Sequence, residues 1–168
     1  MSASLLRSIA NQLTTQQNTI NGLTSIESPA AFLTVTRTAT QAITTAGTAI
    51  VWQSAVRNQG GFDVSGSTIT IPTEGYYSIF TSFALVANTN TYIRLQTGTV
   101  TGLTSYCVPF STGNGFNITT TFGLYLNAGN TIAIALSPAA NTTVNVNLQG
   151  FASPSPYCHI VQLSASLA

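Results

Sequence analysis

Charged side chains are nearly missing from this chain. They make up 4% of its residues, whereas typical soluble domains contain about 25%. Lysine is absent, and the basic side chains are the arginines Arg7, Arg37, Arg57 and Arg94. Nucleic-acid phosphates are bound by several clustered Lys or Arg side chains, so a net charge of +1 argues against a nucleic-acid partner. Thr, Ser, Asn and Gln must supply most of the water-facing surface, which leaves little electrostatic field to steer a partner.

Side chains for catalysis are equally scarce. His159 is the only histidine, Asp63 the only aspartate, and Glu27 and Glu74 are the only glutamates. A catalytic triad requires a nucleophile, a base and an orienting group within hydrogen-bonding reach, and glycoside hydrolysis requires a pair of carboxylates. We expect neither, and the protein is predicted not to be an enzyme. His159 is predicted to lie on an outward or interface side of the last strand, and Asp63 to serve the turn before residue 68.

Metal-binding and membrane-spanning patterns are missing as well. Zinc sites require clustered Cys and His, but Cys107 and Cys158 lie far apart in the sequence. Calcium requires several carboxylates, so the sequence predicts no metal and no cofactor. The two cysteines form either a disulfide or, as we favour, two buried thiols. No apolar run approaches the roughly 18 residues of a membrane span, and the first residues do not resemble a secretion signal.

The clearest positive pattern is β-structure between residues 61 and 85. Residues 68–71 alternate between polar and apolar, Pro72 ends that run, and Glu74 and Gly75 are typical of a tight turn. Gly66 and Gly75 are placed where a chain reversal needs positive φ. One face of a second, longer strand is predicted to carry Tyr77, Ile79, Thr81, Phe83 and Leu85. We therefore expect two strands that pair with each other across the turn.

Short strands with turn signals continue along most of the chain. The remaining predicted strands are 32–36, 49–52, 91–96, 104–109, 116–124, 132–136, 144–148 and 157–163, and residues 54–61 are predicted to form a loop. This spacing is typical of a sandwich or jelly roll. We expect one all-β domain over residues 29–168.

Residues 1–28 follow a different, helical pattern. A coiled-coil seam is marked by alternating intervals of three and four residues. The residues that follow this spacing are Leu6, Ile9, Leu13, Gln16, Ile20 and Leu23. Pro29 prevents the helix from continuing. So short a helix is marginal alone, and the sequence favours a trimeric coiled-coil stalk that also serves as an anchor. The alternative is a helix that packs on its own domain.

Three motifs resemble the complement component one, q subcomponent / tumour necrosis factor superfamily. The first is carried by Phe62, Asp63, Gly66, Ile69, Thr70, Ile71, Pro72, Gly75, Tyr76 and Tyr77; the second is Leu126–Ile132, and the third is Cys158–Leu163. Asn130 stands where that superfamily usually has Asp, and the chain has no collagen repeat. The resemblance implies a ten-stranded antiparallel jelly-roll head that trimerises side by side on an N-terminal stalk.

The resemblance also implies roles for the bulky side chains of the head. The superfamily buries aromatic residues where three heads meet, so we predict core or subunit-interface positions for Trp52, Tyr77, Phe83, Tyr92, Phe122, Leu124 and Tyr157. Tyrosines in exposed loops would instead suit stacking on sugars. The sequence does not separate these two alternatives.

A charge-poor, Thr- and Asn-rich trimer resembles a virion component. The expected function is a homotrimeric capsid-decoration, head-fibre or tail-fibre protein of a bacteriophage, assembled in the host cytoplasm and displayed on the virion surface. Its N-terminal segment would anchor to the major capsid protein or another virion protein. The head would stabilise the shell or bind a host-surface glycan. The alternative is the adhesin or lectin head of a bacterial spore coat or another extracellular trimer.

Overall fold

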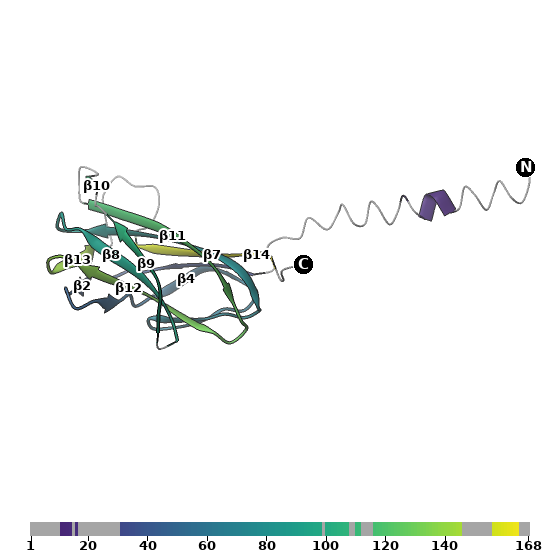
Figure 1. The fold of residues 1–168 in the computed structure, drawn as a ribbon, viewed down its shortest axis with the longest axis horizontal. Helices are drawn as coiled ribbons and strands as arrows, with labels where there is room; N and C mark the ends of the chain where they lie inside the picture. The colour runs from purple at the N-terminus through teal and green to yellow at the C-terminus, as the bar shows by residue number, and fades with distance from the viewer. Residues whose placement is uncertain are drawn as a thin grey trace, which may run out of the picture.

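Two antiparallel β-sheets make up the described part of the head (Figure 1). The computed structural model describes residues 11–14, 16, 31–98, 100–107, 110–111, 116–145 and 156–164. The strands in these ranges are β1 (Phe32–Thr36), β2 (Gln41–Ile43), β3 (Thr48–Ala49), β4 (Ser54–Gln59), β5 (Asp63–Ser65), β6 (Thr68–Thr70), β7 (Gly75–Leu85), β8 (Thr91–Thr97), β9 (Val100–Cys107), β10 (Phe110–Ser111), β11 (Phe116–Leu126), β12 (Thr131–Pro138), β13 (Thr142–Asn145) and β14 (Tyr157–Ser164).

The larger sheet has the strand order β10-β11-β7-β14-β1-β4, and β13 joins it by pairing with β7 and β2. The smaller sheet has the order β5-β6-β12-β8-β9, with β3 paired to β12. Strands that are neighbours in space are often distant in sequence. The first strand β1, for example, pairs with the last strand β14. Crossovers of this kind between two packed sheets are typical of a jelly roll. The predicted antiparallel jelly-roll sandwich is therefore confirmed.

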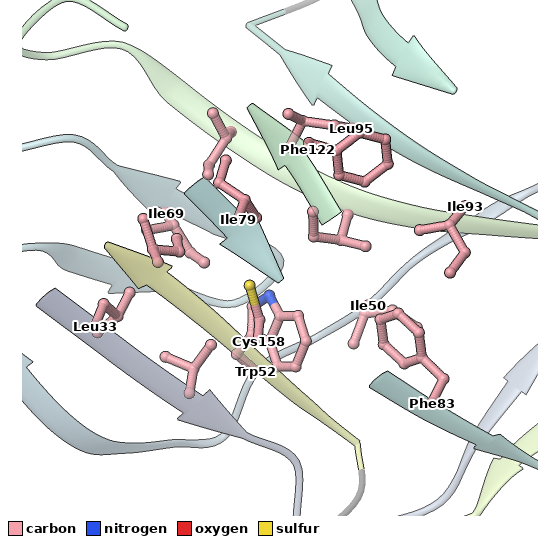
Figure 2. Close-up of a cluster of buried hydrophobic side chains, with 14 of the residues drawn as sticks. Leu33, Ile50, Trp52, Ile69, Ile79, Phe83, Ile93, Leu95, Phe122 and Cys158 are labelled. Carbon is pink, nitrogen blue, oxygen red and sulfur yellow. The ribbon is translucent and has the colours of Figure 1, made fainter. Parts of the chain in front are cut away.

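The core lies between the two sheets, and β7 contributes the largest share of the larger sheet's inner face. As the sequence alternation predicts, Tyr77, Ile79, Thr81, Phe83 and Leu85 are all buried. Strands of both sheets add aliphatic side chains to this cluster, and Figure 2 shows Leu33, Ile69, Ile93 and Leu95 among them. Ile132, Ile134 and Ile160 belong to the same cluster. Burying each such side chain contributes about 1.5–3 kcal/mol, so the core alone accounts for the packing of one sheet on the other.

Each of the ten predicted strands has a counterpart among the fourteen strands of the described residues, and β2, β4, β5 and β10 are additional. The prediction of a loop over residues 54–61 was wrong, since β4 occupies most of it. All six residues of β4 are exposed, because β4 is an edge strand of the larger sheet. An edge strand that buries no side chain carries no apolar alternation, which is why the pattern suggested a loop.

The expected pairing of the strand near residue 69 with β7 was also wrong. The strand β6 pairs with β5 and β12 in the smaller sheet, while β7 pairs with β11, β14 and β13 in the larger one. Residues 71–74 thus carry the chain from one sheet to the other. Ile71 is held at this corner by backbone hydrogen bonds with Asn130 and Gly129, and Pro72 has no N–H to continue a ladder. Asp63, expected to serve a turn, is the first residue of β5 and pairs with Thr70.

Gly75 makes the corner possible. Its φ is 155°, a conformation that other residues adopt only with strain. A Cβ at this position would collide with the backbone oxygen of Ser164 and would lie 2.6 Å from Nε2 of Gln162. Gln162 in turn donates to the Glu74 carbonyl at 2.8 Å. The predicted need for glycine at position 75 is confirmed. The absence of a side chain there lets the start of β7 pack closely against the end of β14.

Candidate subunit interface

The outward side of the larger sheet carries a row of side chains that the strand register places next to one another. Phe80 of β7 pairs with Thr121 of β11 on one side and with His159 of β14 on the other. His159 pairs with Thr34 of β1, and Thr34 pairs with Arg57 of β4. Paired residues of antiparallel strands point to the same side of a sheet. One continuous row therefore crosses five strands.

Aromatic rings fill the middle of this row and its neighbours. The His159 ring lies 4.8 Å from that of Tyr157 and 6.4 Å from that of Phe80, measured between centroids. It also stacks with Phe32 at 6.3 Å, and Phe80 lies 5.7 Å from Tyr157. All four side chains are half-buried. Pairs of rings at such distances gain favourable free energy in addition to that from the area they bury. The contacts within one chain therefore hold the rings of this cluster in place.

A second pair of rings extends the cluster toward the start of β7. Tyr76 and Tyr125 are register partners, and their rings meet edge to face at 5.2 Å. Tyr125 is 40% exposed. A Cβ added to the neighbouring Gly123 would meet no atom within 4 Å, so this part of the sheet is open. We refer to the outward cluster as the aromatic face, which comprises Phe32, Tyr76, Phe80, Tyr125, Tyr157 and His159.

Electrostatically the aromatic face is nearly neutral. Among the described residues, the one permanent charge beside it is Arg57, whose guanidinium carbon lies 5.7 Å from the centre of the Phe32 ring. The carboxylates of the described residues lie elsewhere, with Asp63 on β5 of the smaller sheet and Glu74 in the loop before β7. Burial lowers the pKa of His159, and its Nδ1 lies 2.9 Å from the Thr34 hydroxyl. The imidazole is therefore held in a fixed orientation and favoured in its neutral form.

The residues predicted for the core or interface separate into three groups. Trp52, Tyr77, Phe83 and Phe122 are buried between the sheets, and Leu124 is half-buried against them. Tyr157 lies on the aromatic face. Tyr92, which is 44% exposed, lies on β8 of the smaller sheet.

Sequence reasoning missed Phe32 and Phe80 and placed His159 only in general terms. In β7 the prediction followed the apolar residues at odd positions and ignored the even ones. Those even positions hold Tyr76 and Phe80 with serines at the positions between and beyond them, so an aromatic residue at every fourth position was the available signal. The link from Phe80 to Phe32 needed the register of β14 and β1, which no local pattern contains.

Two of the predicted stalk residues lie within the described ranges. Leu13 and Gln16 belong to the helical residues 11–14 and 16, and both are exposed, Leu13 by 61%. The other four predicted stalk residues lie outside the described residues: Leu6, Ile9, Ile20 and Leu23. The predicted boundary at residues 28 and 29 lies outside them too. The coiled coil stays a prediction.

The described residues hold no cluster suited to metal binding, since no three His, Cys, Asp or Glu side chains gather there. The two cysteines are buried thiols rather than a disulfide. Cys107 points its Sγ at the Thr119 carbonyl oxygen at 3.5 Å, and burial raises the pKa of Cys158 well above its usual value. No helix in the described ranges is long and apolar enough to cross a membrane.

Comparison with known proteins gives the fold. No protein-family model matches the sequence, and no curated protein matches it. Among solved structures, the chain resembles murine APRIL (pH 8.0) with a TM-score of 0.58 at 16% identity, over 79% of this chain and 98% of that one. It also resembles the Eiger TNF from S. frugiperda with a TM-score of 0.52 at 12% identity, over 82% and 94% of the two chains. The chain therefore has a tumour necrosis factor-like jelly-roll fold.

Proposed function

We propose that this chain is a homotrimeric structural protein whose copies pack side by side through the aromatic face. The observation that carries the proposal is the cluster of half-buried rings on the outward side of the larger sheet. Rings covered on one side and open on the other bury their remaining apolar surface when a second copy packs against them. The likeness to tumour necrosis factor folds is consistent with such packing.

A second copy of this chain suits the aromatic face better than a charged partner does. Arg57 is the one permanent charge beside it among the described residues, so a strongly acidic or basic partner would find little complementary field. With 4% charged residues, identical copies repel each other little. The seam of residues 6–23 is an independent reason, because the exposed Leu13 needs neighbouring helices to cover it. Three copies in a closed ring would cover both features at once.

We further propose that the trimer is a virion surface component, assembled in the host cytoplasm. In this role residues 1–28 anchor it to the major capsid protein or another virion protein, as in a head-decoration, head-fibre or tail-fibre protein of a bacteriophage. The uncharged, Thr- and Asn-rich surface supports this role because it allows many copies to sit close together. Many weak contacts from a repeated head would add up through avidity, whether they stabilise the shell or bind a host surface.

A second candidate function is an adhesin or lectin head, for example of a spore coat. The exposure of Tyr92 and Tyr125, at 44% and 40%, favours it, because exposed tyrosine rings can stack on sugars. The two tyrosines lie on different sheets, so each would belong to a separate sugar-binding surface.

Sedimentation velocity of the full chain tests the oligomer. A species of three times 17.5 kDa is expected at micromolar concentration and neutral pH, and a single 17.5 kDa species would contradict the proposal.

Mass spectrometry of purified particles from the source tests whether the chain is a virion component. Particle binding by a variant that lacks residues 1–28 tests the anchor, and we expect this shortened chain not to bind. Retention of the shortened chain on particles would overturn the anchoring role. Binding of the intact trimer on a glycan array, together with its absence from purified particles, would favour the adhesin instead.

A further inference from the structure

His159 is the only histidine of the chain, and it lies at the centre of the aromatic face. Its ring is half-buried among Phe32, Phe80 and Tyr157, in the row that a partner copy would cover. We propose that His159 makes self-association through this face depend on pH, with the neutral imidazole in the assembled form and the imidazolium favouring separated subunits. This inference rests on the proposed trimer and adds a regulation to the same site.

Among the described residues, the carboxylates of Asp63 and Glu74 lie on β5 and before β7, and neither faces the imidazole to compensate a positive charge. On β1 its neighbours are the Thr34 hydroxyl and the Phe32 ring, and on β7 the neighbour is Phe80. On its own strand the titratable side chain that faces it is the phenol of Tyr157, since Cys158 is buried on the opposite side of the strand. Along the row, two strands away, stands Arg57 of β4. A protonated His159 would therefore lie among aromatic rings, with Arg57 as the formal charge in its row and no opposite charge in that row.

The face of an aromatic ring does attract a cation, which works against the proposed effect. Such attraction is already available in the separated subunit, where Phe80 and Phe32 stack on the imidazole from the same chain. Association adds desolvation, which disfavours the charged form. The Thr34 hydroxyl can donate to Nδ1 or accept from it, so this hydrogen bond survives protonation and fixes the ring in both states.

The direction of the pH effect follows from linkage. Burial already lowers the pKa of His159 below its ordinary value of 6.5, and covering the ring with another copy lowers it further. The separated chain then binds protons more readily than the assembled one, so association is strongest above pH 6.5. It weakens as the pH falls from there through the lowered pKa. No other side chain has an ordinary pKa between about pH 5 and 7.

The expected size is large because the effect is repeated in each subunit. At a pH below both the separated and the assembled pKa, each unit by which association lowers this pKa weakens the equilibrium by about tenfold per subunit, or about a thousandfold for a trimer. The concentration at which half of the chains are trimeric would then rise about thirtyfold, since it varies as the square root of that constant.

The test uses sedimentation velocity of the full chain at pH 7.5 and pH 5.0 at constant ionic strength, over a concentration series. We expect trimers at pH 7.5 and a clear shift to smaller species at pH 5.0. The variant His159→Phe keeps an aromatic ring without a titrating proton and is expected to associate equally at both pH values. It also reports any contribution from the three carboxylates. If that variant fails to fold, His159→Gln takes its place.

A second measurement needs no variant. Because the chain has one histidine, its imidazole resonance in an NMR titration needs no assignment, and by reciprocity its pKa must fall as protein concentration rises. A pKa that does not depend on concentration, or an equal loss of trimer at pH 5.0 in His159→Phe, would overturn the switch. Trimers of the native chain that persist at pH 5.0 would overturn it too and leave the trimer intact. Monomers at pH 7.5 would instead contradict the proposed function.

Discussion

The two sides of the larger sheet differ in how far a single chain completes them. The inner side is apolar and sealed, with Ile79, Phe83 and Ile160 fully buried against the smaller sheet. The outer side carries rings and hydroxyls, and its central residues Phe80 and His159 stay half-buried. Both sides are built by the same strands with the same period of two. The inner side therefore completes the fold of a single chain, while the outer side leaves apolar surface for another molecule to cover.

The largest expected effect comes from breaking the inner side. Replacing Phe83 by Ala removes a fully buried ring that packs against Trp52 at 6.2 Å, which costs about 3–5 kcal/mol in the free energy of unfolding. Typical domains have about 5–15 kcal/mol in total, so the head would be barely folded at 37 °C. Chemical denaturation measures the loss. A loss below about 1 kcal/mol would mean that the inner side is not the main source of stability.

The matched change on the outer side is Phe80→Ala, three residues earlier on the same strand. It removes ring contacts with Tyr157 and His159, worth about 1 kcal/mol to the isolated subunit. Its main effect should be on association, by about 2 kcal/mol or more per subunit if the ring is central to the interface. Dilution followed by sedimentation velocity measures that effect. Should Phe80→Ala unfold the head and leave trimers intact, the contrast between the two sides would be mistaken.

The inner side could be predicted from the sequence because alternation is a local signal. In β7 the odd-numbered positions from Tyr77 to Leu85 were predicted to form one face of the strand, and all of them are buried. The same local reasoning failed at residues 71–74, where the chain crosses between sheets. A hairpin and a crossover begin with the same Pro and Gly residues. Long-range contacts distinguish them: β6 pairs with β12, and Ile71 forms backbone hydrogen bonds with the loop at residues 129–130.

The outer side was predicted less well because it depends on register between distant strands. Tyr157 was selected in advance and His159 was placed on an outward or interface side of the last strand, but their neighbours Phe32 and Phe80 were missed. The contact of His159 with Thr34 joins residues 125 positions apart, and no pattern within either strand encodes it. Arg57 lies in β4, whose exposed residues suggested a loop. A site assembled across a sheet can therefore be read from a sequence only after the strand order is known.

The smallest expected effect is on the free energy of unfolding when the hydroxyl of either Tyr76 or Tyr77 is removed. These adjacent side chains point to opposite sides of β7. The hydroxyl of Tyr77 donates to the Thr73 carbonyl at 2.6 Å and lies 3.2 Å from the Thr73 hydroxyl. Tyr77→Phe should therefore lower the free energy of unfolding by about 1 kcal/mol. Tyr76→Phe keeps the ring against Tyr125 and should change it by less than about 0.5 kcal/mol. Denaturant titrations of the two variants at one pH and concentration make the comparison. If Tyr76→Phe were the more destabilising of the two, the hydroxyl at the sheet-to-sheet corner would not secure the inner side, and the outer side would already contribute to the stability of the single head.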